Sequence, residues 1–205
     1  MSSKKRAEVQ RRTFWTPLRV VSTFIALALL AAFGVSSCTS HDDKTVTLPN
    51  SPGPSVAGNA LPANVRDSEL RTADGATIKI SDYSGKVLLV NLWATWCGPC
   101  RIEIPELVKI HKEFQSRGVE MIGLSTENPD ASAQTVRDFV RDFNIDYRVG
   151  WATPEVAVTL MQGRDSIPQS FIITRDGRIV KRFIGFSPGS TPPQLRQALE
   201  EALKS

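Results

Sequence analysis

The sequence predicts one α/β domain over residues 66–205, with a central mixed sheet flanked by helices and an N-terminal β-hairpin. The main evidence is the nearly continuous apolar run at 86–93, which is typical of a central strand covered on both faces. A helical stretch and a second apolar run at 119–125 follow, and strand, helix and strand at this spacing form a right-handed parallel crossover. Asp-Gly pairs between strand-like runs indicate hairpins near both ends of the region.

The first half of the domain divides into four elements. Strand-like residues on either side of an Asp-Gly pair predict a hairpin over 69–80, which is followed by the central strand. The stretch 98–116 fits a helix that ends before Gly118, with a kink at Pro105 because proline has no N–H to donate. The next strand then begins directly after Gly118.

The second half alternates helices and strands. Apolar residues at helical spacing predict a helix over 136–143, and residues 147–149 fit one more short strand. A capping threonine followed by proline predicts a helix over 153–161. A second hairpin is expected over 171–184, and an amphipathic helix from residue 191 closes the domain.

The basic character of the chain is confined to its first 37 residues. The net charge is +4, but residues 1–37 contain six Lys or Arg and one Glu. That excess of five positive charges leaves a net charge of −1 for the rest of the chain. A nucleic-acid-binding domain would carry a basic patch on its folded part, so the charge distribution argues against a nucleic-acid partner.

An uncharged run of 16 residues, 20–35, follows the basic stretch. It is short for the roughly 20 residues that span a bilayer, and its basic flank is typical of a signal peptide. A valine, two serines and Cys38 then resemble the site at which bacterial lipoproteins are cleaved, which predicts that Cys38 carries a lipid. An uncleaved anchor helix, cleavage that leaves Cys38 free, and export through the arginine pair at 11–12 remain alternatives. Each places the remaining chain outside the cytoplasmic membrane, where disulfides form.

The chain therefore divides into three segments. Residues 1–37 are a signal or membrane-targeting segment, and residues 66–205 are the folded domain. Between them, residues 38–65 carry the lipid-attachment cysteine and are rich in Pro, Gly, Ser and Asn, which is typical of a flexible tether. Such a tether leaves a folded head free to reach large partners near the membrane.

Two cysteines three positions apart, in Cys97-Gly98-Pro99-Cys100, follow the buried strand and begin the helix. Unpaired N–H groups and the macrodipole at a helix N-terminus favour the thiolate of the first cysteine. Cys100, one turn further on, can reach Cys97 to close a disulfide. We expect Cys97 to be exposed and Cys100 to be buried, because helix geometry points the first thiol outward and the second into the base of the helix.

A structural disulfide and half a zinc site are the alternative interpretations. Closing so short a loop stabilises a fold by only about 2 kcal/mol, against about 3 kcal/mol for a loop of 15 residues. A zinc site needs two further ligands, and the candidates Cys38, His41 and His111 form no second pair. A histidine on a helix is usually a surface or satisfied residue. The spacing therefore favours a redox pair, and no metal or cofactor is expected.

Residues 91–101, NLWATWCGPCR, resemble the active-site segment of the thioredoxin superfamily. Further motifs narrow the resemblance to the membrane-tethered TlpA/ResA/CcmG-like thiol-disulfide oxidoreductases. The similarity extends from about residue 67 to the C-terminus. The matching motifs are Ser81–Lys86, Cys100–Pro105, Ile167–Pro168 and Phe171–Gly177.

This resemblance implies a thioredoxin-like fold with a central α-β insertion, here about residues 129–149. It makes Cys97 the attacking thiol and Cys100 the resolving thiol. It also makes Pro168 a cis proline that faces the cysteines, and Glu103 an acidic residue that tunes them. A cis X-Pro bond costs only about 0.5–1 kcal/mol relative to trans, and it leaves neighbouring backbone groups open to a substrate strand.

Glu103 has a second interpretation, as a first-turn acid that the helix dipole stabilises by about 0.3–1 kcal/mol. If Glu103 tunes the cysteines, its substitution by Gln should shift the cysteine titration or the reduction potential and change stability by no more than about 1 kcal/mol, the scale of a helix-end charge. Asn91 departs from thioredoxin itself, which has a buried acid six residues before the first cysteine. Asparagine is usual at this position in the TlpA-like group, and it moves proton handling toward Glu103 or water.

The resemblance implies an extracytoplasmic, membrane-tethered reductase, expected to be a monomer, that exchanges disulfides with protein substrates such as apocytochrome c. Its electrons would arrive through a membrane thiol-reductant transporter. A thiol peroxidase of the peroxiredoxin type is one alternative, but it would use a single reactive cysteine in a different motif. A Sco-type copper chaperone is another, but it needs one more residue between its cysteines and a distal histidine, whereas His111 follows Cys100 by only 11 residues. The sequence leaves the direction of electron flow open.

Overall fold

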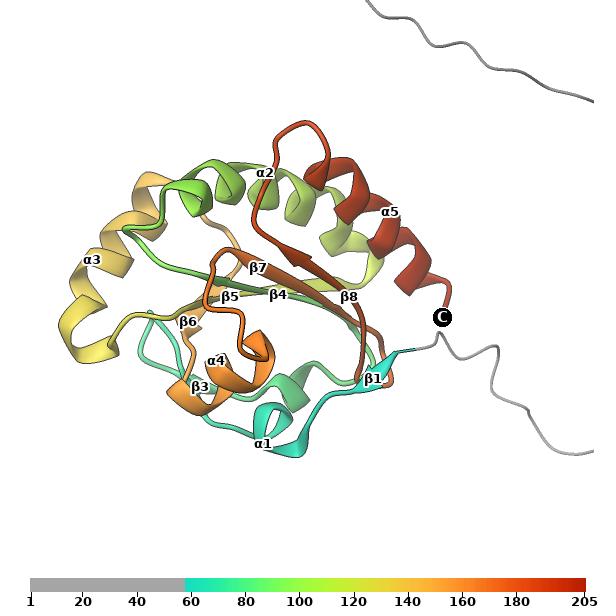
Figure 1. The fold of residues 1–205 in the computed structure, drawn as a ribbon, viewed down its shortest axis with the longest axis horizontal. Helices are drawn as coiled ribbons and strands as arrows, with labels where there is room; N and C mark the ends of the chain where they lie inside the picture. The colour runs from blue at the N-terminus through green and yellow to red at the C-terminus, as the bar shows by residue number, and fades with distance from the viewer. Residues whose placement is uncertain (1–57) are drawn as a thin grey trace, which may run out of the picture. The chain divides into compact units, whose positions relative to one another are not determined.

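A computed structural model describes residues 58–205 of the protein. A six-stranded mixed sheet with the order β1-β8-β7-β4-β5-β6 forms the centre of this domain (Figure 1). Its strands are β1 (Asn59–Ala60), β4 (Val87–Trp93), β5 (Val119–Ser125), β6 (Arg148–Trp151), β7 (Gln169–Ile173) and β8 (Arg178–Ile184). A separate hairpin consists of β2 (Leu70–Arg71) and β3 (Thr77–Ile78). The helices are α1 (Ala63–Arg66), α2 (Gly98–Phe114), α3 (Pro129–Asp142), α4 (Pro154–Met161) and α5 (Thr191–Leu203), with 3₁₀ turns η1 (Ile80–Tyr83) and η2 (Gln115–Arg117).

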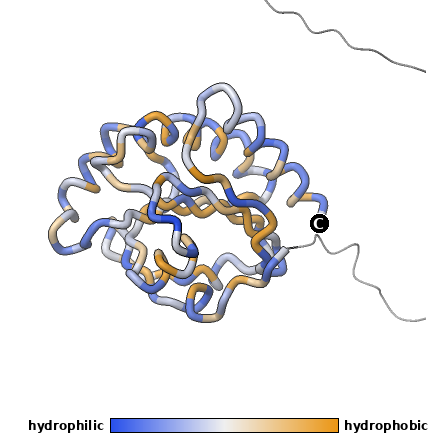
Figure 2. Tube along the Cα trace, viewed as in Figure 1, coloured by the Kyte–Doolittle hydropathy of each residue, from blue (hydrophilic) through white to orange (hydrophobic). Residues whose placement is uncertain are grey.

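Helices cover both faces of the sheet, with α2, α3 and α5 on one side and α1 and α4 on the other (Figure 1). Strand β4 is buried along all seven of its residues, as its apolar run predicts. Its side chains alternate between two hydrophobic clusters, because successive residues of a strand point to opposite faces. Leu89 and Trp93 face α2, whereas Leu88 and Leu92 face the other layer. The apolar strands accordingly run through the middle of the described domain, residues 58–205 (Figure 2).

Strand pairing brings together residues that are distant in sequence. Strand β4 pairs in parallel with β5 and antiparallel with β7. Asn91 therefore lies directly opposite Ser170 on one side and Gly123 on the other. Since paired residues in adjacent strands point to the same face of the sheet, Asn91 and Ser170 both project toward helix α2.

The folded domain begins earlier than residue 66, the boundary expected from composition. Strand β1 pairs with β8, and the N–H of Leu61 donates to the carbonyl oxygen of Gly177 at 2.9 Å. Leu61 and Val65 are buried in the cluster beneath β4. These elements are two and four residues long, too short for a periodic pattern, and their burial depends on distant segments.

Most predicted elements are present, with shifted ends. The C-terminal half of the first hairpin ends at Ile78, and η1 follows where a strand was expected as far as residue 80. Helix α2 continues through Pro105 to Phe114, and Gly118 adopts a left-handed φ of 90° after it. Helix α3 begins at Pro129, because Asn128 caps it by accepting the N–H groups of two following residues.

The predicted signal segment, the lipid-attachment residue Cys38 and the tether before residue 58 lie outside the described residues. Within residues 58–205, no helix has the length and apolarity needed to cross a bilayer.

Candidate active site

Cys97 and Cys100 form a disulfide at the N-terminus of α2, with their Cα atoms 5.3 Å apart. Cys97 is the N-cap residue, and its Sγ accepts the N–H of Cys100 at 3.2 Å. Pro99 lies in the first turn, where the missing N–H has no helical partner to lose. The first sulfur is therefore next to unpaired N–H groups and the positive end of the helix dipole, which stabilise a thiolate when the pair is reduced.

Cys97 is far less exposed than expected. Only 4% of its surface is accessible, so the expected exposure of Cys97 is wrong, whereas Cys100 is fully buried, as expected. The reason lies in a distant segment, because the carbonyl oxygen of Ile167 is 3.7 Å from the Sγ of Cys97. The adjacent Trp96 is 71% exposed and presents a large aromatic surface beside the sulfur.

Pro168 follows a cis peptide bond after Ile167, as the resemblance implies. Its carbonyl oxygen accepts the N–H of Gly185 at 2.8 Å, which fixes the start of β7 against the end of β8. The side chain of Gln169 donates to the carbonyl oxygens of Arg164 and Ser166 at 2.9 and 2.8 Å. These bonds hold the segment that presents the Ile167 carbonyl to Cys97.

Glu103 is fully buried one helical turn after Cys100. The Nδ2 of Asn91 donates to Glu103 Oε2 at 2.9 Å and also to the Oγ of Ser170 at 3.0 Å. The Oγ of Ser170 in turn donates to Glu103 Oε1 at 3.2 Å. The interpretation of Glu103 as a first-turn acid stabilised by the helix dipole is therefore wrong, because the first turn of α2 holds no acidic residue and Glu103 is buried against the sheet.

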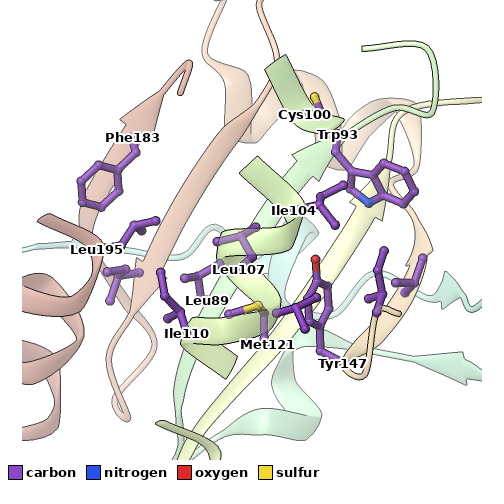
Figure 3. Packing of buried hydrophobic residues seen from close by; sticks show 14 of the residues in the cluster. Leu89, Trp93, Cys100, Ile104, Leu107, Ile110, Met121, Tyr147, Phe183 and Leu195 are labelled. Atoms are coloured by element: carbon purple, nitrogen blue, oxygen red, sulfur yellow. The ribbon is translucent and has the colours of Figure 1, made fainter. Parts of the chain in front are cut away.

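Burial raises the pKa of Glu103 to about 7, although the hydrogen bonds from Asn91 and Ser170 act in the opposite direction. Desolvation disfavours the carboxylate, and within the described part of the chain no charged side chain compensates for it. Burial also raises the pKa of Tyr147, and the Glu103 carboxylate adds to this effect. Figure 3 shows Tyr147 among the buried side chains of the cluster that includes Ile104, Leu107 and Met121. Because its pKa is about 7, the Glu103 carboxyl group can exchange a proton near neutral pH.

The loop between β4 and α2 is held from both sides. The N–H and Oγ1 of Thr95 donate to the two carboxylate oxygens of Glu127 at 2.8 and 2.7 Å. On the other side, Arg101 donates to the carbonyl oxygen of Thr95 at 3.2 Å and lies over the ring of Phe139 on α3. The insertion thus supports the loop that presents Trp96 and Cys97.

Sequence reasoning missed Ser170 and Glu127. Ser170 follows the predicted cis proline by two positions, so the pairing of β7 with β4 would have placed it beside Asn91. Glu127 follows β5, and the carboxyl ends of neighbouring parallel strands meet at one edge of the sheet. Neither signal can be used without the strand register.

His111 is not part of this site. It lies 11 residues beyond Cys100 on α2, about 16 Å away at the rise of an α-helix. Its Nδ1 is 3.0 Å from the Oδ1 of Asp146, so it is a satisfied, nearly buried residue. Cys38 and His41 lie outside the described residues, and within residues 58–205 no group of three His, Cys, Asp or Glu side chains could hold a metal ion.

A family model described as Redoxin matches residues 56–199. The chain belongs to the Redoxin family. This redoxin is similar to the thiol-disulfide oxidoreductase ResA of Bacillus thuringiensis subsp. konkukian, with 29% identity over 64% of this chain and 69% of that protein. The ResA of Geobacillus thermodenitrificans is 26% identical over 88% of this chain and 94% of its own length.

Solved structures agree with these relatives. A thiol:disulfide interchange protein of the thioredoxin family from Chlorobium tepidum superposes with a TM-score of 0.60 and 27% identity, covering 73% of this redoxin and 99% of that chain. Peroxiredoxin Q from Xanthomonas campestris reaches the same TM-score at 15% identity over 73% of this chain and 99% of its own, a likeness that shows the fold alone. The predicted thioredoxin-like fold is confirmed, and the redoxin is a thiol-disulfide oxidoreductase with a Cys97–Cys100 pair.

Proposed function

We propose that this redoxin is a membrane-tethered reductase on the extracytoplasmic side of the bacterial cytoplasmic membrane. It passes electrons from a membrane thiol-reductant transporter to disulfides of protein substrates, with apocytochrome c as the substrate class. The observation that carries the proposal is the buried Glu103, one helical turn after the buried Cys100 on α2. A proton acceptor at this place assists attack by Cys100, which is the step that completes reduction of a substrate.

The reaction proceeds through a mixed disulfide. The Cys97 thiolate attacks one sulfur of the substrate disulfide, so that a bond forms to Cys97 and the other substrate sulfur leaves as a thiolate. Cys100 then loses its proton to Glu103 and attacks the Sγ of Cys97, which releases the second substrate sulfur. The substrate gains two electrons, and the Cys97–Cys100 disulfide that forms is reduced again by the transporter.

The surface around the disulfide suits an extended polypeptide. The Ile167 carbonyl lies beside Cys97, where an extended substrate strand can pair with the backbone of this segment. Trp96 and Ile102, 71% and 57% exposed, flank the cysteines and provide apolar contact area. A protein substrate can therefore dock through its backbone with little dependence on its sequence.

Trapping of the mixed disulfide tests the exchange reaction. The Cys100→Ser variant should accumulate a covalent adduct with a peptide that carries an oxidised Cys-x-x-Cys pair, since nothing then resolves the bond at Cys97. The matched Cys97→Ser variant should form none. Equal adduct formation by both variants, or none with folded Cys100→Ser protein, would contradict the assignment. Assays of peroxide consumption and of copper binding on the same protein separate the reductase from a peroxidase and from a copper chaperone.

The tether is tested on the full-length chain. The uncharged run at 20–35 followed by Cys38 supports a lipid anchor. Cys38→Ala should abolish labelling by a radioactive fatty acid while disulfide exchange continues at the same rate. Undiminished labelling would contradict lipid attachment at this residue.

A further inference from the structure

Three buried polar side chains meet behind the disulfide, and they differ in what hydrogen bonding allows them to do. Asn91 directs both N–H groups of its amide into the cluster, toward Glu103 and Ser170, and its Oδ1 has no hydrogen-bond partner within the described part of the chain. Ser170 accepts from Asn91 and donates to Glu103 Oε1. An ionised Glu103 is therefore matched by two donors, one at each oxygen.

A protonated Glu103 needs an acceptor instead. The Nδ2 of Asn91 has no lone pair to offer, so Oε2 is a poor position for the proton. The Oγ of Ser170 has two lone pairs and a hydroxyl hydrogen that rotates, so it can accept from Oε1 while it continues to accept from Asn91. Ser170 is thus the member of the cluster that can change from donor to acceptor.

We propose that Ser170 is a positioning residue for disulfide exchange, which lets Glu103 take up and release the proton of Cys100 by holding that proton on Oε1. This inference rests on the reductase proposed above. The proton moves from the Cys100 sulfur to Oε1 as Cys100 attacks Cys97, and it returns from Oε1 to the Cys100 sulfur when the transporter reduces the disulfide again. No other reactant is required.

The neutral surroundings of Glu103 make its protonation sensitive to the hydroxyl group of Ser170. The titratable groups around it are Cys100, one turn earlier on its own helix, and Tyr147 from the segment before β6, whose pKa the Glu103 carboxylate helps to raise. Strands β4 and β7 contribute Asn91 and Ser170, which are neutral, and no charged side chain among residues 58–205 affects its pKa. A change in one neutral hydrogen bond is therefore not masked by a nearby charge.

Release of a coloured aromatic thiol separates the two cysteines in one experiment. When the reduced protein is mixed with an aromatic disulfide, the first equivalent of thiol reports attack by Cys97 and the second reports attack by Cys100. For Ser170→Ala, the pH midpoint of the second phase should rise by roughly half a unit to one unit. The reason is that a hydrogen bond to a carboxylate is stronger than one to a neutral acid. The first phase should keep its midpoint.

Two further variants give a matched comparison at nearly constant shape. Ser170→Thr retains the hydroxyl group and should keep the wild-type midpoint, whereas Ser170→Val lacks it and should behave as Ser170→Ala. A midpoint that stays in place in both hydroxyl-free variants, or that moves equally in Thr and Val, would overturn the role of Ser170. The infrared C=O band of the protonated carboxyl, identified by its loss in Glu103→Gln, should also move in Ala and Val but not in Thr.

Failure of this inference can be told apart from failure of the proposed function. If Glu103→Gln slows the second phase and the Ser170 variants shift nothing, the role of Ser170 is wrong and the reductase mechanism stands. If the wild-type protein releases no second equivalent of thiol, Cys100 does not resolve the adduct, and both proposals are wrong.

Discussion

Helix α2 carries a buried ionisable side chain near each end, and the two are held in different ways. Glu103, behind the cysteines, forms side-chain hydrogen bonds only with the neutral groups of Asn91 and Ser170 among residues 58–205. His111, toward the other end, is 3.0 Å from the carboxylate of Asp146 and is 7% exposed. A buried acid without a counter-charge is energetically costly and titrates near neutral pH, whereas a paired residue stabilises its surroundings. The difference separates a group suited to chemistry from one suited to structure.

Replacement of Glu103 and of His111 by Gln should give the largest difference between the two ends of α2, in the rate of disulfide exchange. Glu103→Gln removes the proton acceptor, so the Cys100-dependent phase of disulfide exchange should slow by about 100-fold and lose its dependence on pH near 7, the value to which burial raises the Glu103 pKa. His111→Gln retains a hydrogen-bonding partner for Asp146 and should leave that phase unchanged. Both rates are measured by stopped-flow release of an aromatic thiol.

A slow second phase in both variants would contradict this separation, since it would mean that the whole helix, and not Glu103, governs the step. An unchanged pH profile in Glu103→Gln would leave Glu103 with a structural role alone.

Stability should depend on pH through Glu103. Its folded-state pKa of about 7 lies above the unfolded value of 4.5, so the native state binds more protons between these limits. The contribution of the protonated group is complete below pH 4.5 and is lost as the pH rises through 7. Over this interval the free energy of unfolding of the wild type should fall by about 3 kcal/mol relative to Glu103→Gln.

Urea unfolding of the oxidised protein at pH 4.5 and pH 8 measures this difference, and subtraction of the Glu103→Gln values removes the contribution of other groups. His111→Gln serves as the control and should show the wild-type change. A wild type that becomes more stable than Glu103→Gln as the pH rises would have the opposite sign and would show that the carboxylate is the favoured form.

Local patterns predicted the fold and the cysteine pair, but not the surroundings of either buried residue on α2. The continuous apolar run of β4 and the spacing of Cys97 and Cys100 depend on neighbours in sequence, and both were assigned correctly. The burial of Glu103 depends on Ser170, which is 67 positions away and is placed by the register of β7 against β4. The low exposure of Cys97 and the position of α1 have the same kind of long-range cause.

Removal of the His111 side chain should affect stability alone. His111→Ala leaves a cavity beside Tyr147, whose ring contacts the histidine edge-on, and it removes the hydrogen bond to Asp146. Because Asp146 is partly exposed and can be hydrated, the loss of unfolding free energy should be moderate, about 2 kcal/mol. Chemical denaturation measures it, and both phases of thiol release should keep their wild-type rates. A slower Cys100 phase at unchanged stability would connect the two ends of α2 functionally.

The smallest effect is expected from a truncation remote from both ends of α2. A chain that starts at Leu61 loses the two exposed residues of β1 and their pairing with β8, while Leu61 and Val65 remain to fill the cluster beneath β4. The unfolding free energy should fall by about 1 kcal/mol, and disulfide exchange should be unchanged.

A chain that starts at Asp67 also loses both buried side chains, which should cost at least about 3 kcal/mol. Equal stability of the two chains would show that α1 does not belong to the folded domain. Loss of exchange in a folded chain that starts at Leu61 would show instead that the preceding residues contribute to the active site.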